Sequence, residues 1–299
     1  MSIFPTRIFL ATDGSKEAGL AARSAAELAD KTGSELHVVH VLALPLDTHD
    51  PSSLEPEVRQ RLETRARRSL EEEMSRIEAL GGAVEGSHLR VGRPDAEILA
   101  LAEEINAGLI VMGSRGVGGV RRALVGSVSD SVVRHAHCPV LMVRGEPVSS
   151  PTQVLLATDG SQDAELAATT AIDLSKRLDA ELHTVYVEPM PERHSSRSMR
   201  FPVDLPAEVV ESVEQEAKIK LEEQLQKIKQ AGEVAHAHPR VGVPPAEIVA
   251  LAEEIGAGLI VMGSRGLGGI RRTLIGSISD SVVRHAHCPV LVVRGEHGE

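Results

Sequence analysis

The second half of the sequence repeats the first. Residues 91–146 align without a gap with residues 241–296, and only ten of these 56 positions differ. Near the start of each half, residues 10–15 and 156–161 are both Leu-Ala-Thr-Asp-Gly-Ser. A period near 150 residues is too long for a solenoid repeat, so the chain is predicted to be a duplicated domain. We expect domains over residues 1–146 and 152–299, with residues 147–151 as a short, turn-rich linker.

The net charge and the cysteine content indicate which partners are excluded and which cellular compartment is expected. The 299 residues carry a formal net charge of −11, which argues against nucleic acid and anionic membranes as partners. No apolar run approaches the roughly 20 residues of a membrane span, and the first seven residues lack the plan of a signal peptide. Cys138 and Cys288 occupy equivalent positions and form a poor disulfide framework, so a reducing compartment is expected. Together these features predict a cytoplasmic protein.

Each half alternates segments that have the patterns of strands and helices. In the first half the predicted strands are residues 7–12, 35–41, 84–91, 109–112 and 139–143, and the predicted helices are 16–31, 54–80, 94–105 and 127–136. This alternation predicts an α/β fold of two tandem doubly wound (Rossmann-like) domains. Each domain is expected to have a five-stranded parallel sheet of order 3-2-1-4-5 with helices on both faces. Ligands bind such sheets beyond the carboxyl ends of the strands, where the segments after residues 12 and 112 lie.

A glycine-rich segment follows the fourth predicted strand in each half. In the first half it runs from Gly113 to Ser127 and opens the last helix. Glycine lets the backbone approach a ligand closely, and the amides at a helix start attract anions, with Ser127 or Ser129 offering a hydroxyl. The segment is neither a Walker A motif nor a dinucleotide fingerprint. Its natural ligand is a phosphate chain; the alternative is a flexible turn with Ser127 as the N-cap of the helix.

The glycines follow the pattern G-x2-G-x9-G-[S/T] in both halves. The matching residues are Gly113, Gly116, Gly126 and Ser127, and again Gly263, Gly266, Gly276 and Ser277. Three further segments accompany the pattern in each half: Thr-Asp-Gly-Ser after the first strand, Val-Met-Gly-Ser-Arg-Gly through the fourth, and His-Cys-Pro-Val before the last. The combination resembles the ATP-binding signature of the universal stress protein family, and the resemblance covers essentially the whole chain, twice.

The resemblance implies one ATP site in each half, with Mg²⁺ or Mn²⁺ accompanying the nucleotide. It implies that Asp13 and Asp159 contact the nucleoside, and that Val41 and Val187 hold the adenine edge through backbone groups. Because the chain has one Tyr, three Phe and no Trp, we expect an adenine pocket of aliphatic side chains and backbone. The full set of expected binding residues is Ala11, Thr12, Asp13, Val41, Met112, Gly113, Arg115, Gly116, Gly126, Ser127 and Val128 in the first half, and Ala157, Thr158, Asp159, Val187, Met262, Gly263, Arg265, Gly266, Gly276, Ser277 and Ile278 in the second.

The two aspartates after the first strands leave alternatives open. Asp13 and Asp159 are either nucleoside contacts or N-caps of the following helix, with a catalytic role as the remaining alternative. Ser15 and Ser161 compete for the capping role, and if they take it, the aspartates are left for the ligand.

Other conspicuous side chains receive plainer interpretations. The His-Ala-His-Cys segments at 135–138 and 285–288 are interpreted as helix ends with a buried cysteine, since zinc needs three or four converging ligands. The Arg pairs at 121–122 and 271–272 either reach phosphate oxygens or are solvated. No residue is assigned as a catalytic group or as a protein ligand of a metal.

Two further expectations concern assembly and function. The strand at residues 140–143 would lie at a sheet edge, and the resemblance implies dimerisation through that strand, so the halves are expected to pair as an internal pseudo-dimer, with a homodimer of chains as a further possibility. The expected function is that of an ATP-binding stress-response regulator whose occupancy alters conformation or the choice of an unidentified protein partner. The alternatives are a slow ATPase or nucleotide phosphotransferase, and an interaction scaffold in which the nucleotide is only structural.

Overall fold

The computed structural model describes residues 6–43, 55–116, 125–145, 151–189, 207–230, 235–267 and 275–295. The first half contains β1 (Arg7–Thr12), α1 (Lys16–Thr32), β2 (Glu35–Ala43), α2 (Pro56–Ala79), β3 (Gly86–Gly92), α3 (Pro94–Glu104), β4 (Leu109–Gly113), α4 (Ser127–His135) and β5 (Val140–Val143). The second half contains β6 (Gln153–Ala157), α5 (Gln162–Leu178), β7 (Glu181–Pro189), α6 (Ala207–Gln230), β8 (Ala235–Gly242), α7 (Pro244–Glu254), β9 (Leu259–Gly263), α8 (Ser277–His285) and β10 (Val290–Val293). None of the described helices has the length and hydropathy of a membrane span.

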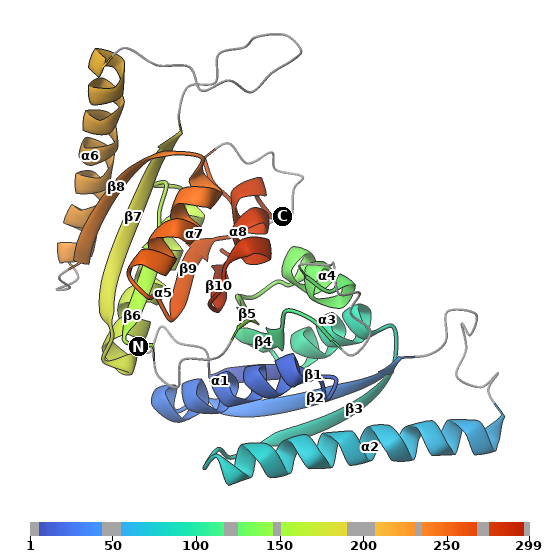
Figure 1. The fold of residues 1–299 in the computed structure, drawn as a ribbon. Coiled ribbons are helices and arrows are strands. Elements are labelled where there is room, and N and C mark those ends of the chain that lie inside the picture. The colour runs from blue at the N-terminus through green and yellow to red at the C-terminus, as the bar shows by residue number, and fades with distance from the viewer. Residues whose placement is uncertain are drawn as a thin grey trace, which may run out of the picture.

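The ten strands form one continuous sheet. Its order is β3-β2-β1-β4-β5-β10-β9-β6-β7-β8, so each half has the predicted order 3-2-1-4-5. Within each half all neighbours are parallel, and the second half follows the same plan. The α/β fold with two tandem doubly wound sheets is therefore confirmed. Figure 1 shows the two halves side by side, with β5 and β10 between them and α2 and α6 at the outer ends.

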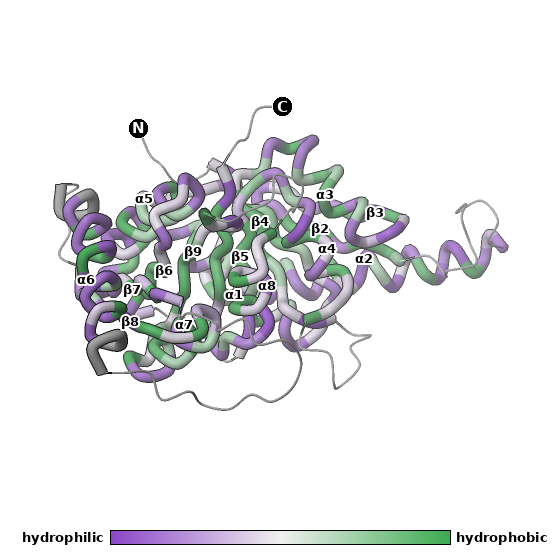
Figure 2. The backbone as a smooth tube through the Cα atoms, turned by 90° about the horizontal axis from the view of Figure 1, so that it is seen from above, coloured by the Kyte–Doolittle hydropathy of each residue, from purple (hydrophilic) through white to green (hydrophobic). Residues whose placement is uncertain are grey.

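Two hydrophobic layers sandwich the sheet. In the first half α1 and α2 pack on one face, through residues such as Ala22 and Ile77, whereas α3 and α4 pack on the other, through Leu101 and Val132. The central strands are largely hydrophobic, and α2 alternates between hydrophilic and hydrophobic residues (Figure 2). This alternation is the pattern of a helix with one face on the core and one in water. The sequence patterns thus account for helices on both faces.

The two halves meet through the expected edge strands. β5 and β10 pair antiparallel, with Leu141 opposite Leu291, and both side chains are 3% exposed. These leucines belong to a single hydrophobic cluster that includes core residues of both halves. The internal pairing expected from the sequence is therefore present. Assembly of two chains stays a prediction.

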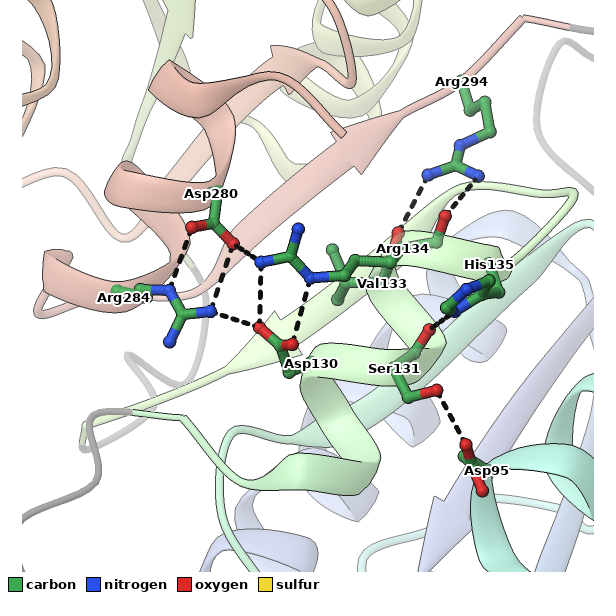
Figure 3. Close-up of polar contacts among 9 residues, drawn as sticks. All are labelled: Asp95, Asp130, Ser131, Val133, Arg134, His135, Asp280, Arg284 and Arg294. Atoms are coloured by element: carbon green, nitrogen blue, oxygen red, sulfur yellow. Dashed lines mark hydrogen bonds and ion pairs between the residues drawn. The ribbon is translucent and has the colours of Figure 1, made fainter. Parts of the chain in front are cut away.

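Charged side chains reinforce the junction between the halves. Asp130 and Arg134 of α4 face Asp280 and Arg284 of α8, and each arginine contacts both carboxylates (Figure 3). The Nη2 of Arg134 lies 2.5 Å from Oδ1 of Asp280. The guanidinium of Arg294 donates to the carbonyl oxygens of residues 133, 134 and 136 at the end of α4. Arg294 thus caps a helix of the other half, where unpaired carbonyls attract a cation.

Candidate functional site

The loops after β1 and β4 meet at the carboxyl edge of each half-sheet. In the first half the Oγ of Ser15 donates to the carbonyl of Arg115 at 3.4 Å. In the second, the Oγ of Ser161 donates to the carbonyl of Arg265 at 3.1 Å. The edge where the sequence places a ligand is therefore formed twice, by the same pair of loops.

The serines, not the aspartates, cap the helices that follow the first strands. Ser15 accepts a hydrogen bond from the amide of Ala18, and Ser161 accepts one from the amide of Ala164. Asp159 instead accepts from the amide of Ser161 through Oδ1 and from that of Leu267 through Oδ2, both at 3.0 Å. The carboxylate of Asp159 therefore holds the glycine loop against the end of β6, and the N-cap alternative for the aspartates is wrong.

Close approach explains the glycines at 116 and 266. A Cβ on Gly116 would stand 2.2 Å from Oδ2 of Asp13, and one on Gly266 would stand 2.3 Å from Oδ2 of Asp159. Such contacts are far below van der Waals separation, so any side chain here would displace the aspartate. Gly113 meets the backbone of α1 in a similar way, because its Cβ would lie 2.8 Å from the carbonyl carbon of Glu17. Close packing therefore accounts for the first two glycines of the pattern, whereas a Cβ on Gly126 would make only ordinary contacts, at 3.6 Å and beyond.

The start of α4 differs from the sequence interpretation in two details. The N-cap is Gly126 and not Ser127, and no side chain caps the helix. The hydroxyl of Ser129 is buried and donates to the carbonyl of Gly113 at 2.9 Å, so its proton is used to brace β4. Ser279 and Gly263 repeat the contact at 2.8 Å. The exposed hydroxyl of Ser127 and the first amides of the helix remain as anion-binding groups.

A pocket of about 470 Å³ opens at this edge in the second half. Every residue that the sequence assigned to the second site lines it: Ala157, Thr158, Asp159, Val187, Met262, Gly263, Arg265, Gly266, Gly276, Ser277 and Ile278. The sequence interpretation missed the following lining residues: Ala164, Val185, Tyr186, Pro189, Pro244, Ile248, Leu267, Ile275 and Ser279. Pro244 and Ile248 lie in the first turns of α7, and the signal that could have found them is the position of that helix directly after the β8 edge strand.

The only tyrosine of the chain is among the lining residues, but its side chain packs in the hydrophobic layer under α6, on the face of the sheet opposite Val185 and Ile248. Tyr186 is 7% exposed, and its hydroxyl donates to Glu188, which also pairs with Lys220 of α6. Burial raises the pKa of Tyr186 above its usual value, so the phenol stays protonated at neutral pH. The aligned position in the first half is His40, whose pKa is lowered by burial.

The first half has a buried carboxyl group on α2, behind the end of β1. Thr12 donates to Oε2 of Glu73 on α2 at 3.4 Å, and Glu73 is 1% exposed. Burial, with a smaller contribution from the charge of Asp13, raises the pKa of Glu73. α2 and α6 are both 24 residues long, and aligning them end to end places the neutral Gln224 opposite Glu73. The two edges therefore share their loops but differ in the buried carboxyl group beside them, which is Glu73 in the first half and Asp163 in the second.

Of the remaining groups predicted from the sequence, one set lies at helix ends and the other lies outside the described residues. Cys138 and Cys288 are free thiols, and burial raises the pKa of each to about 12, which fits the interpretation of a helix end with a buried cysteine. His135 places Nδ1 2.7 Å from the carbonyl of Ser131 in the preceding turn. The Arg pairs at 121–122 and 271–272, the linker residues 147–150 and the rim at 190–206 lie outside the described residues.

Comparison with known proteins identifies the class. Two tandem doubly wound domains with a glycine loop after the fourth strand define the fold and the candidate site, and the sequence profile of the Universal stress protein family matches residues 5–144 and again 151–294. The chain belongs to the universal stress protein family.

Individual relatives share the tandem arrangement. The chain is 33% identical over 220 residues to universal stress protein Rv2005c of Mycobacterium tuberculosis, covering 70% of this chain and 68% of that protein. It is 29% identical over 308 residues to universal stress protein Rv2623 of the same species, covering 96% of both chains. The crystal structure of a universal stress protein from Archaeoglobus fulgidus superposes with a TM-score of 0.72 at 28% identity, covering 96% of each chain.

Proposed function

We propose that each half binds one ATP together with a divalent cation, Mg²⁺ or Mn²⁺. The observation that carries the proposal is the pocket of the second half. Its volume falls within the range of about 300–1,000 Å³ typical of small-molecule sites. It joins a carboxylate, a glycine loop held close by that carboxylate, and the start of a helix. The pocket combines a carboxylate that can accept hydrogen bonds from hydroxyls, an apolar wall and an anion-binding helix start. A nucleotide has a part that suits each of these, and few other ligands do.

The pocket residues divide into three parts that suit the parts of ATP. Val185, Val187 and Ile248 are apolar side chains suited to the adenine ring. Asp159 is suited to accept hydrogen bonds from ribose hydroxyls, and it is the only carboxylate among the described lining residues. The amides at the start of α8, with the exposed Ser277, are suited to the phosphates.

The cation is expected to be held mainly by the phosphates and water. A magnesium ion in protein sites usually retains several waters and binds substrate phosphates together with one or two carboxylates. With a single carboxylate among the described lining residues, the pocket suits a cation that arrives with the nucleotide. We assign the first-half site on the same loops, from Ala11, Thr12 and Asp13 through Met112, Gly113, Arg115 and Gly116 to Gly126, Ser127 and Val128, with Val41 at the adenine edge.

The proposed biological role is regulation. Both sites lie on one continuous sheet whose halves share a hydrophobic cluster, so occupancy of one site has a physical route to the other and to a protein partner. The proposal includes a cytoplasmic location, because free cysteine thiols suit a reducing compartment. It also includes the domain limits 1–146 and 152–299 and the possibility of a homodimer.

The test is a calorimetric titration of the full chain with ATP and Mg²⁺. The wild-type protein is expected to bind two equivalents. Gly266→Ala should remove one equivalent, because its Cβ would displace Asp159, and adding Gly116→Ala should remove the other. Gly19→Ala is the matched control, since it adds the same methyl group in α1 with no atom within 4 Å.

Unchanged binding in the double variant, with circular dichroism showing intact folding, would refute the assigned sites. Hydrolysis well above background that disappears in the same variant would favour the slow ATPase or phosphotransferase. Equal binding of a protein partner by apo and ATP-loaded protein would favour the scaffold.

A further inference from the structure

A group of imidazoles and a carboxylate lies at the amino end of β7 and β8, away from the pocket. Glu181 and His183 are on β7, and the strand register places His236 of β8 opposite His183. Residues two apart on a strand share a face, so Glu181, His183, His236 and His238 all point to the same side of the sheet. Val187, which lines the pocket, follows Glu181 by six residues, or about 20 Å of extended strand. The group is therefore separate from the proposed ATP site.

His183 is the centre of this group. Its side chain is buried, with 7% of the residue exposed, and its Nε2 has no hydrogen-bond partner among the described residues. Oε2 of Glu181 lies 3.8 Å from that nitrogen, which is too long for a hydrogen bond. A buried polar atom left without a partner costs free energy, so a bound group that pairs with it would be favoured.

The other nitrogen of His183 is already held in place. Nδ1 of His183 lies 3.0 Å from Nε2 of His238, within hydrogen-bonding distance. The ring also stacks on that of His236, with centroids 4.7 Å apart. An imidazole that donates from Nδ1 presents a lone pair at Nε2, which is how metal-binding histidines are usually oriented by a neighbour.

We propose that Glu181, His183 and His236 bind a divalent transition-metal ion of the Zn²⁺ class, with His238 as the residue that positions His183. One ligand atom from each of the three lies within 4.8 Å of the others. Bonds of about 2.0–2.2 Å in a tetrahedral site place ligand atoms about 3.4 Å apart, so side-chain rotations that unstack His236 from His183 must close the site. Glu181 and His236 are exposed and free to make them. Two imidazoles and one carboxylate suit Zn²⁺ better than Mg²⁺ or Ca²⁺ and leave a position for water.

The first half supplies an internal comparison. The residues aligned with Glu181, His183 and His238 are Glu35, His37 and His88. Nδ1 of His37 lies 3.2 Å from Nε2 of His88. The position opposite His37 is Gly86, however, and a Cβ there would stand 2.4 Å from His37 Nδ1. The first half therefore keeps the oriented histidine but lacks the third ligand. Among the described residues, only the second-half group meets the spacing of a metal site.

A metal here would join β7 to β8, the last strand of the sheet. An ion bound by the native strands but not by the unfolded chain raises stability by mass action. The structural consequence is a second half whose edge strand is stabilised by Zn²⁺, independently of any nucleotide.

The test is a titration of the nucleotide-free, EDTA-treated full chain with Zn²⁺, and with Co²⁺ for its visible absorption. One equivalent with tetrahedral Co²⁺ bands and a Zn²⁺-dependent rise in Tm are expected. His236→Gly, which copies the first half, and Glu181→Gln should each weaken binding at least tenfold and reduce the rise in Tm. His37→Ala is the matched control in the first half and should leave both unchanged.

Equal affinity in wild type and His236→Gly would overturn the proposal. So would an equal loss in His37→Ala, which would indicate scattered binding to surface histidines. If His236→Gly fails to fold, Glu181→Gln still decides the question, because it keeps the size of an exposed side chain and removes only the anionic ligand.

Discussion

Leu141 is the residue at which a single substitution should reach both halves of the protein. It lies in β5 opposite Leu291 of β10, and both are 3% exposed within a hydrophobic cluster shared by the two halves. Leu141→Ala removes buried methyl groups and leaves a cavity, which costs about 2–5 kcal/mol in protein cores. Because part of that packing is against Leu291 of the second half, part of the loss should appear there.

Native-state hydrogen exchange measures the two halves separately. Amide protection in β1 reports opening of the first half, and protection in β6 reports opening of the second. Leu141→Ala should lower the opening free energy in both strands. Leu36→Ala is the matched control, because it makes the same deletion in β2, at 1% exposure and remote from the junction. It should lower protection in β1 and leave β6 nearly unchanged.

Unchanged protection of β6 in Leu141→Ala would refute the reasoning. That result would mean that the halves fold and open independently, and that the pairing of β5 with β10 carries no energetic coupling. The proposed communication between the two sites would then lack its physical route.

Three further substitutions test local features by chemical denaturation. Glu73→Gln should have a larger free energy of unfolding than wild type at pH 7. Because the pKa of Glu73 is raised in the folded protein, the wild type loses stability as the pH rises from 4.5 through the folded pKa, and the variant should lack this dependence on pH. Asp179→Gly should stabilise by about 0.5–1 kcal/mol, since Asp179 ends α5 at φ 53°, where the first half has Gly33 at φ 68°. Arg294→Ala should cost about 1–3 kcal/mol by removing its charged hydrogen bonds to the end of α4. A change in the free energy of unfolding of the opposite sign would contradict the structural role given to the substituted residue.

The sheet order and the pairing of the halves could be predicted from the sequence for physical reasons. Strands that alternate with helices must be parallel, and right-handed crossovers leave few orders. The duplication places an apolar four-residue strand at the inner edge of each half, and these two edges cover one another. The helix caps at Ser15 and Ser161 are equally local, because a cap depends on residues within one turn.

Features that depend on packing between distant segments were missed or misread. Ser129 reads as a possible ligand group, but it is 4% exposed and is used to brace Gly113. Pro244 and Ile248 line the pocket from α7, which lies outside the motifs that indicated the site. The register that brings His183 opposite His236 joins strands more than 50 residues apart, and His236 stands where the two copies diverge. Local patterns carry no information about such a register.

The central claim is that the chain carries two ATP sites, and the nucleotide carried by freshly purified protein tests it most directly. The nucleotide is released by denaturation and identified by mass spectrometry, and the protein is quantified by amino-acid analysis because the chain has no Trp and one Tyr. Close to two ATP per chain is the predicted result. Absence of nucleotide, followed by no binding on titration with ATP and Mg²⁺, would contradict the account.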